Sequence, residues 1–226
     1  MTLLTGRRER RQPAPAPSRG PGRPTPLTDQ RVRLSAGAVA LLCTALAARG
    51  NRVGACEQRL FRAVNEVPDA LYPPGWVVMQ LGTLGAVPAA ATASWLAEDR
   101  ELAGRLVTAG SVSWLLSKGV KLVVRRDRPA TLLPGTRGRG RDAAGLGYRS
   151  GHAGVAFALG AAALPRLGPR GRALVLAAVP AVALMRVYVG AHLPLDIAGG
   201  GALGLAVEAG LSLIPTSRGL DPATGA

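Results

Sequence analysis

The stretch WVVMQLGTLGAVPAAATASWLA, residues 76–97, decides the fold class of this chain. It contains no charged side chain, and its two tryptophans, Trp76 and Trp95, are 19 residues apart. On an α-helix this separation is about 28 Å, which matches the thickness of a bilayer's hydrocarbon core, and tryptophan favours both membrane interfaces. The run therefore predicts a membrane-spanning helix with a tryptophan near each end.

Outward from this stretch, five more apolar runs are separated by charged or glycine-rich segments. They cover residues 34–48, 102–124, 152–164, 173–189 and 194–214. Together the six runs predict an all-α, polytopic membrane helix bundle with about six transmembrane helices. In the last run, the spacing of Gly200 and Gly204 suits close contact with another helix, although simple flexibility near a helix start is an equal alternative.

The bundle is expected over residues 34–214, with a tail on each side. Residues 1–33 carry eight arginines, six prolines and no sustained apolar run, so we expect a disordered basic cytoplasmic tail there. Residues 215–226 are a short C-terminal tail. The formal net charge of the chain is +15, and we expect the basic tail to contact anionic lipid headgroups. It lacks the interleaved aromatic residues that nucleic-acid binding favours, so no nucleic-acid partner is predicted.

Six helices place both termini on the same side of the membrane. The tail and the arginines after residue 164 make that side cytoplasmic, so the protein is predicted in the plasma membrane with the loops 125–151 and 190–193 facing outward. The arginines of the longer loop oppose the positive-inside tendency, which suggests that they serve a local task. The arginine-rich stretch 125–141 favours a substrate with a highly charged headgroup.

Cys43 and Cys56 have no cysteine or histidine cluster around them and are interpreted as structural.

Three polar segments lie at the predicted outer ends of the helices. In the first, Lys121 and Arg128 are seven residues apart and would share one face of a helix, while Pro129 biases Arg128 toward an extended backbone. The two cations could hold one anion together. For either residue alone, an interfacial side chain that snorkels to water is the more common explanation.

The second segment, Ser150-Gly151-His152, directly precedes an apolar helix. Backbone amides at a helix N-terminus favour phosphate, and glycine permits its close approach. His152 at the same place could donate a proton to a leaving oxygen. A capping or interfacial histidine is an equally good reading of His152 in isolation.

The third segment runs from Arg186 to Asp196 and contains His192 four residues before the aspartate. At this separation a carboxylate can orient an imidazole and stabilise its charged form. Arg186 could bind the same phosphate through its planar fork of donors. A simple interfacial pair of His192 and Asp196 is the alternative, but both histidines of the chain fall within these segments, which makes chance clustering an unattractive account.

The ordered set Lys-x6-Arg-Pro, Ser-Gly-His and Arg-x5-His-x3-Asp resembles the type 2 phosphatidic acid phosphatase superfamily over roughly residues 75–205. The resemblance implies a six-helix membrane core with an active site at the outer interface, and a phosphohistidine mechanism that uses no metal ion and no cofactor. It implies that His192 is the nucleophile, Asp196 its orienting partner and His152 the acid. The residues that hold the phosphoryl oxygens would be Lys121, Arg128, Ser150, Gly151 and Arg186.

Two positions depart from the family pattern, because Arg149 replaces a usual proline and Met185 an often-found serine. Both departures affect the expected substrate preference and rate more than the reaction type. The function predicted is hydrolysis of a lipid phosphate or diphosphate, with a polyprenyl diphosphate or a phosphatidic-acid-like lipid as substrate. The main alternative is a catalytically silent lipid-binding or transport protein of the same fold. A soluble haloperoxidase with the same phosphate pocket fits the long apolar runs poorly.

Overall fold

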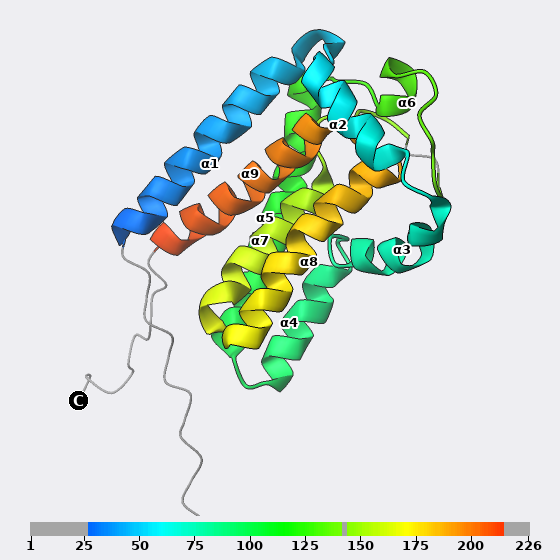
Figure 1. Cartoon of the computed structure of the whole chain (residues 1–226). Helices are drawn as coiled ribbons and strands as arrows, with labels where there is room; N and C mark the ends of the chain where they lie inside the picture. Colours follow the sequence, from blue (N-terminus) through cyan, green and yellow to red (C-terminus); the bar gives the residue numbers. More distant parts are fainter. Residues whose placement is uncertain (1–26, 142–143, 215–226) are drawn as a thin grey trace, which may run out of the picture.

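The computed structural model describes residues 27–141 and 144–214, and within these ranges the chain is helical, with no β-strand (Figure 1). The helices, with three short 3-10 turns between them, are α1 (Leu27–Ala48), α2 (Ala55–Asn65), α3 (Tyr72–Gln80), α4 (Ala86–Leu96), α5 (Arg100–Val124), α6 (Pro129–Leu132), α7 (Gly151–Ala163), α8 (Pro169–Tyr188) and α9 (Pro194–Leu213). The predicted all-α class is confirmed.

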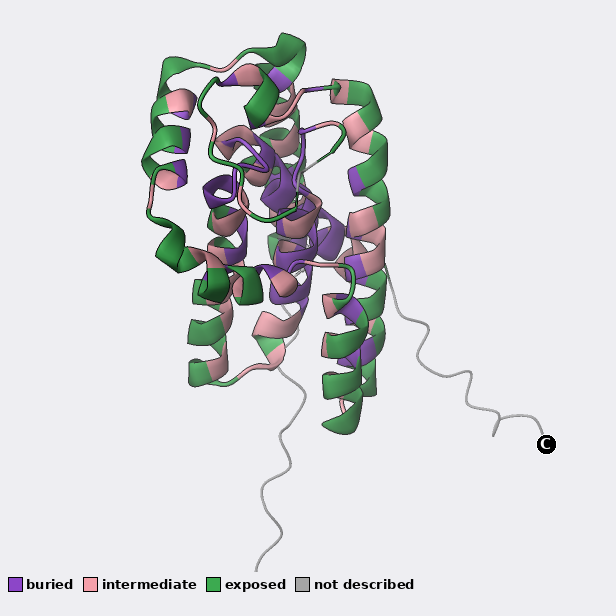
Figure 2. Cartoon of the chain, turned by 90° about the vertical axis from the view of Figure 1, so that its right-hand side faces the viewer, coloured by how far each residue is buried: buried purple, intermediate pink, exposed green. Residues whose placement is uncertain are grey.

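Helices α7 and α9 form the centre of the bundle. Most residues of both helices are buried, and Figure 2 shows the buried residues at the centre of the bundle and the exposed ones on its outer sides. A Cβ atom added at Gly200 would lie 2.5 Å from the Ser150 carbonyl oxygen, and one added at Gly204 would lie 2.9 Å from the Ala158 amide nitrogen. The two backbones therefore touch along the Gly200 and Gly204 face, as the helix-contact interpretation predicted.

The outer surface of the bundle is apolar, as a lipid-facing surface must be. Its exposed side chains include Val39, Leu42, Leu115, Val123 and Leu174. Three helical stretches are long and apolar enough to cross a membrane, namely Asp29–Asn51, Arg100–Leu132 and Pro169–Tyr188. The fold is thus that of a multi-pass membrane protein, and six spans remain a prediction.

The tryptophan-bounded run 76–97 is not one straight spanning helix, so this prediction is wrong. The run is split into α3 and α4, which meet at an angle with a turn at residues 81–85 between them (Figure 1). Gly82 in this turn lies so close to α7 that an added Cβ would be 2.7 Å from the carbonyl oxygen of His152. The turn therefore brings the end of α3 against the start of α7, and Trp76 lies beside the site described below.

At the N-terminus, α1 begins at Leu27, so the part of the predicted tail from residue 27 to 33 is helical. Residues 1–26 and 215–226 lie outside the described residues. Helix α1 runs beside α9 (Figure 1), and the carboxylate of Glu208 on α9 forms ion pairs with Arg33 on α1 at 3.2 Å and with Arg105 on α5 at 2.9 Å. These pairs join three helices at the end of the bundle opposite the site.

Candidate active site

Lys121 and Arg128 hold the loop that connects α5 to α7. Lys121, in the last turn of α5, donates a hydrogen bond from Nζ to the Leu146 carbonyl at 3.2 Å. Arg128 is extended before Pro129, as predicted, with φ −84° and ψ 162°. Because α5 ends at Val124, Arg128 does not share a helix face with Lys121, and that part of the prediction is wrong. Its guanidinium donates to the carbonyls of Ala144 at 2.9 Å and of Ala191 at 2.7 Å. Part of the donor capacity of both cations therefore fixes the backbone around the site.

The Ser150-Gly151-His152 segment begins α7. The Ser150 hydroxyl accepts a hydrogen bond from the Ala153 amide at 3.3 Å, and the Ser150 amide donates to the Asp196 carbonyl at 2.9 Å. Ser150 therefore caps α7 and joins it to α9, and its own amide is not free for a phosphate. The first-turn amides of Gly151 and His152 have no acceptor within the helix.

Arg186, His192 and Asp196 are brought together where α8 ends and α9 begins. The Arg186 carbonyl accepts the amides of both Ala191 and His192 at 3.1 Å, which folds the connecting loop back onto α8. His192 Nδ1 lies 3.6 Å from Asp196 Oδ2, slightly beyond the length of a hydrogen bond. The other contact of that oxygen is the Leu193 amide, which donates at 2.8 Å.

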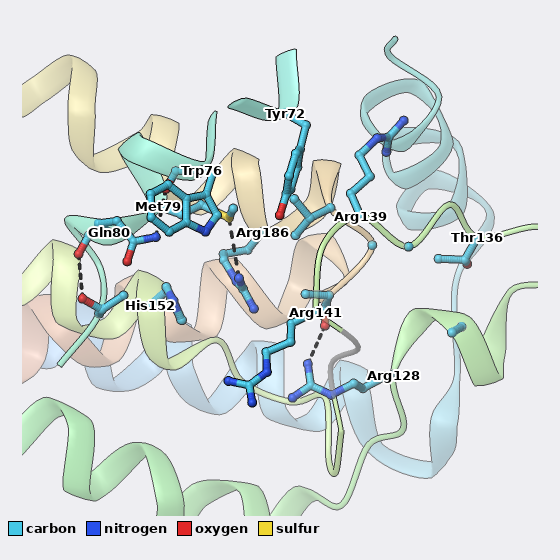
Figure 3. Close-up of a pocket in the computed structure, with 16 residues that line it drawn as sticks. Tyr72, Trp76, Met79, Gln80, Arg128, Thr136, Arg139, Arg141, His152 and Arg186 are labelled. Atoms are coloured by element: carbon cyan, nitrogen blue, oxygen red, sulfur yellow. Dashed lines mark hydrogen bonds between the residues drawn. The ribbon is translucent and has the colours of Figure 1, made fainter. Parts of the chain in front are cut away.

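A pocket of about 600 Å³ opens between these segments and α3. Figure 3 shows His152, Arg186, Arg141 and Arg128 around it, with Tyr72 and Trp76 on the opposite wall. Among the described residues, four arginines and one histidine line the pocket, and no aspartate or glutamate does. Such a lining attracts a multiply charged anion.

The two lining arginines with the most different roles are Arg139 and Arg186. Arg139 is fully engaged, because it donates to Asp69 at 2.7 Å and to the Tyr188 carbonyl at 2.6 Å, and it stacks on the Tyr188 ring. By contrast, Nε of Arg186 is buried without a hydrogen-bond partner in the described part of the chain, and its Nη1 reaches only the sulfur of Met79, at 3.5 Å. Within the described residues, Arg186 therefore keeps hydrogen-bond donors at the pocket that no protein oxygen accepts.

His192 lies behind the pocket wall and is 2% exposed. Its neighbour Ala191 lines the pocket, and its imidazole interacts electrostatically with Arg186 and Arg128. Burial, which outweighs the opposing effect of Asp196, lowers the pKa of His192 to about 4, so the imidazole is neutral at pH 7. The Ser150 amide donates to the Asp196 carbonyl and Arg128 donates to the Ala191 carbonyl, so the three segments converge as predicted.

The sequence did not single out Arg126 or Glu57 near this site, and it marked Arg149 only as a departure from the family pattern. Arg126 and Glu57 form a buried network with Asp196, with Arg126 Nη1 3.0 Å from both carboxylates. Arg126 belongs to the same Arg-Arg-Asp-Arg run as Arg128, but its spacing along the chain gave no reason to assign it a role different from that of the neighbouring arginines. Arg149 points into the bundle, where it donates to the Ser117 hydroxyl at 2.7 Å, and burial lowers its pKa to about 10. It does not line the pocket.

In the described ranges, no group of three or more His, Cys, Asp or Glu side chains is arranged to hold a metal ion. Cys43 and Cys56 are free and exposed.

Two solved structures share this fold. One is the crystal structure of Aquifex aeolicus LpxE, at a TM-score of 0.65 and 20% sequence identity, covering 73% of this chain and 98% of that one. The other is a PAP2-type phosphatidylglycerolphosphate phosphatase from Bacillus subtilis, a transmembrane protein, at a TM-score of 0.62 and 20% identity, covering 78% of this chain and 92% of that one. No curated protein matches the sequence.

The PAP2 superfamily model matches residues 102–219, slightly more than half of the chain. This range contains all three polar segments and every residue predicted for the site. With the helical membrane fold and the convergence of the segments, the match shows that the chain belongs to the PAP2 superfamily, the type 2 phosphatidic acid phosphatases that its motifs resemble.

Proposed function

We propose that this protein hydrolyses a phosphate monoester or diphosphate on a membrane lipid through a phosphohistidine at His192, without a metal ion. The observation that carries the proposal is that His152 lines a cationic pocket whose wall includes Ala191, the neighbour of His192. His152 and Arg186 line it, and His192, paired with Asp196, lies directly behind its wall. These groups come from two segments far apart in the sequence, so their convergence is a property of the fold.

In the first step, Nε2 of His192 attacks the phosphorus atom, because Nδ1 faces Asp196. The new N–P bond forms as the P–O bond to the lipid breaks. Asp196 stabilises the positive charge that develops on the imidazole. Protonated His152 gives its proton to the leaving oxygen, and the negative charge of the bound phosphate favours that protonated form.

In the second step, water attacks the phosphohistidine while His152 takes a proton from it. The N–P bond breaks, orthophosphate leaves and both imidazoles return to their starting state. Arg186 and Arg128 stabilise the charge on the equatorial phosphoryl oxygens, the role that metal ions have in many phosphoryl-transfer enzymes. Lys121 and the amides of Gly151 and His152 are the further donors at this end of the bundle.

An apolar groove supports a lipid substrate. It has a volume of about 550 Å³ and lies between α4 and α8, with residues of α7 such as Ala156 and Gly160 at its base. Gln80 and Thr83 line both this groove and the cationic pocket. A phosphate held in the pocket would therefore leave a hydrocarbon chain at the groove, where it contacts apolar side chains. A polyprenyl diphosphate and a phosphatidic-acid-like lipid both fit this arrangement.

Orthophosphate release tests the activity. Purified protein in detergent is assayed with a panel of lipid monophosphates and diphosphates in the presence of a chelator, beside His192→Ala and His152→Ala. We expect turnover by the wild type with chelator present and its loss in His192→Ala. Equal rates in all three proteins refute the mechanism, and turnover that stops with the chelator indicates a metal enzyme. Binding of lipid without any turnover favours the catalytically silent alternative.

We place the protein in the plasma membrane with the site on the outer face. The test is labelling of a cysteine introduced at Gly138 with an impermeant maleimide in intact cells, in a background with Cys43→Ser and Cys56→Ser because both natural cysteines are exposed. We expect labelling without permeabilisation. Labelling only after permeabilisation contradicts an outward-facing site.

A further inference from the structure

Behind His192 lies a buried ionic network that reaches outside the three polar segments. Its centre is Arg126, whose side chain is 0% exposed. Arg126 Nη1 donates to Glu57 Oε1 and to Asp196 Oδ1, both at 3.0 Å, and Nη2 donates to Glu57 Oε2 at 2.6 Å. One guanidinium therefore joins a carboxylate of α2 to the carboxylate that faces the nucleophile.

The two carboxylate oxygens of Asp196 have different partners. Oδ1 accepts from Arg126, while Oδ2 accepts from the Leu193 amide at 2.8 Å and faces His192 Nδ1 at 3.6 Å. Because the guanidinium is planar and is fixed by Glu57 through two bonds, it also fixes the plane of the Asp196 carboxylate. Rotation of that carboxylate away from His192 would break the bond to Arg126.

Glu57 also fixes the start of α9. Its Oε1 accepts the Leu195 amide at 3.0 Å, directly before Asp196 in the chain. Glu57 lies on α2, outside the range matched by the family model, and is only 8% exposed. A buried carboxylate needs such partners to offset the loss of water. Its three hydrogen bonds supply them and tie α2 to the catalytic end of α9.

The charges of the network explain why two carboxylates are present. The formal charges of Arg126 and Asp196 alone would sum to zero, so the pair would produce little negative electrostatic potential at His192. With Glu57 the three groups sum to −1. That charge faces an imidazole that must become positive when it is phosphorylated.

We propose that Glu57 and Arg126 are positioning residues for the His192–Asp196 pair: they fix the edge of the Asp196 carboxylate that faces His192 and keep one net negative charge behind the nucleophile. This inference rests on the proposed function of His192. Neither residue lines the cationic pocket, so both act through Asp196 and the start of α9.

The test compares inhibition constants for two oxyanions. Orthovanadate copies the five-coordinate transition state of phosphoryl transfer, whereas inorganic phosphate resembles the product. The variants are Glu57→Gln, which removes the charge at constant shape, Glu57→Asp, which keeps the charge but shortens the side chain, and Arg126→Lys. Glu101→Gln is the matched control, because Glu101 pairs with Arg166 at 2.9 Å at the other end of the bundle.

We expect Glu57→Gln to raise the orthovanadate inhibition constant about tenfold or more and to lower kcat by a similar factor. The KM and the phosphate constant should stay close to wild type. Arg126→Lys should behave alike, Glu57→Asp should fall between, and Glu101→Gln should match the wild type. An inhibition constant does not depend on the fraction of protein that is folded, so a partly unfolded variant still gives a valid result.

An orthovanadate constant in Glu57→Gln and Arg126→Lys equal to that of wild type overturns the inference, and so does an equal rise in the phosphate constant. These outcomes are distinct from a failure of the proposed function. In that case the wild type itself releases no phosphate, or His192→Ala remains active.

Discussion

Gly204 allows α9 to touch α7, and replacing it with alanine should damage both stability and turnover. The added Cβ would lie 2.9 Å from the Ala158 amide nitrogen and 3.0 Å from the Phe157 Cβ, and it would be closer still to the Gly154 carbonyl oxygen. Ordinary contact begins at 3.4 Å, so the helices must separate by about 0.5 Å to relieve the Ala158 contact and by more to relieve the Gly154 contact. Gly154 is two residues after His152, which must therefore shift relative to Asp196 on α9.

Overpacking of this kind costs about 1–3 kcal/mol of stability. A misplacement of catalytic groups that approaches 1 Å lowers turnover by up to about 100-fold. The matched control is Gly210→Ala on the same helix, because its added Cβ would meet only Leu34, at 3.7 Å. That change should be neutral or, through helix propensity, slightly stabilising.

The assays are phosphate release from a lipid phosphate in detergent and thermal unfolding followed by tryptophan fluorescence. We expect Gly204→Ala to have a lower kcat and a lower Tm than both the wild type and Gly210→Ala. If the two variants have the same Tm and the same kcat, the close contact of α7 and α9 does not position the site, and this reasoning is refuted.

Two further predictions concern single groups of the site. Burial lowers the pKa of His192 to about 4, so its imidazole should stay neutral as the pH falls from 7 and gain a proton only near pH 4. NMR of protein with ¹⁵N-labelled histidine measures this titration, and His152→Gln identifies which of the two histidine signals belongs to His192. A titration of His192 near the ordinary value of 6.5 would contradict the prediction. Arg186→Lys keeps the charge but loses the planar fork of donors and the unpaired Nε, so kcat/KM should fall about tenfold or more with little change in Tm. Arg139→Lys should instead lower Tm, because the donors that it loses bind Asp69 and backbone carbonyls. Steady-state kinetics and melting curves separate the two variants, and an unchanged kcat/KM in Arg186→Lys would argue against a phosphate role for Arg186.

The convergence of the site could be predicted because both histidines, the aspartate and the arginine pair lie near helix ends. Topology then brings ends on the same side together, and the identities of His152, His192 and Asp196 limit what such a cluster can do. The close contact of α9 with another helix could also be predicted, since Gly200 and Gly204 are four residues apart on one helix face. These signals depend on spacing along the chain, which the sequence contains directly.

The break at residues 81–85 could not be read from hydropathy. An apolar run has the same composition whether it crosses the membrane straight or turns, and the tryptophan spacing assumed a continuous helix. The turn exists because Gly82 packs against the start of α7 and the Thr83 hydroxyl bonds to the Gln80 carbonyl at 2.8 Å. Both contacts are tertiary or local details that no periodicity reports, and they place Trp76 in the pocket wall.

The number of arginines was also a poor guide to the headgroup. Among those in residues 125–141, Arg126 is buried with two carboxylates, and Arg139 and Arg137 donate to backbone carbonyls. Arg141 lines the pocket and makes no hydrogen bond or ion pair within the described ranges. Most of these cations thus hold a long loop together, which the sequence could not distinguish from binding a ligand. The polyvalent headgroup therefore remains a prediction carried by the pocket lining.

The site of phosphoryl attachment tests the central claim most directly. Protein quenched during turnover of a lipid phosphate is digested, and the peptides are weighed by mass spectrometry under conditions that preserve phosphohistidine. We predict one added phosphoryl group on the peptide that contains His192, and none in His192→Ala. Continued turnover with no phosphoryl group on that peptide, or one found on His152 instead, would contradict the assignment of the nucleophile.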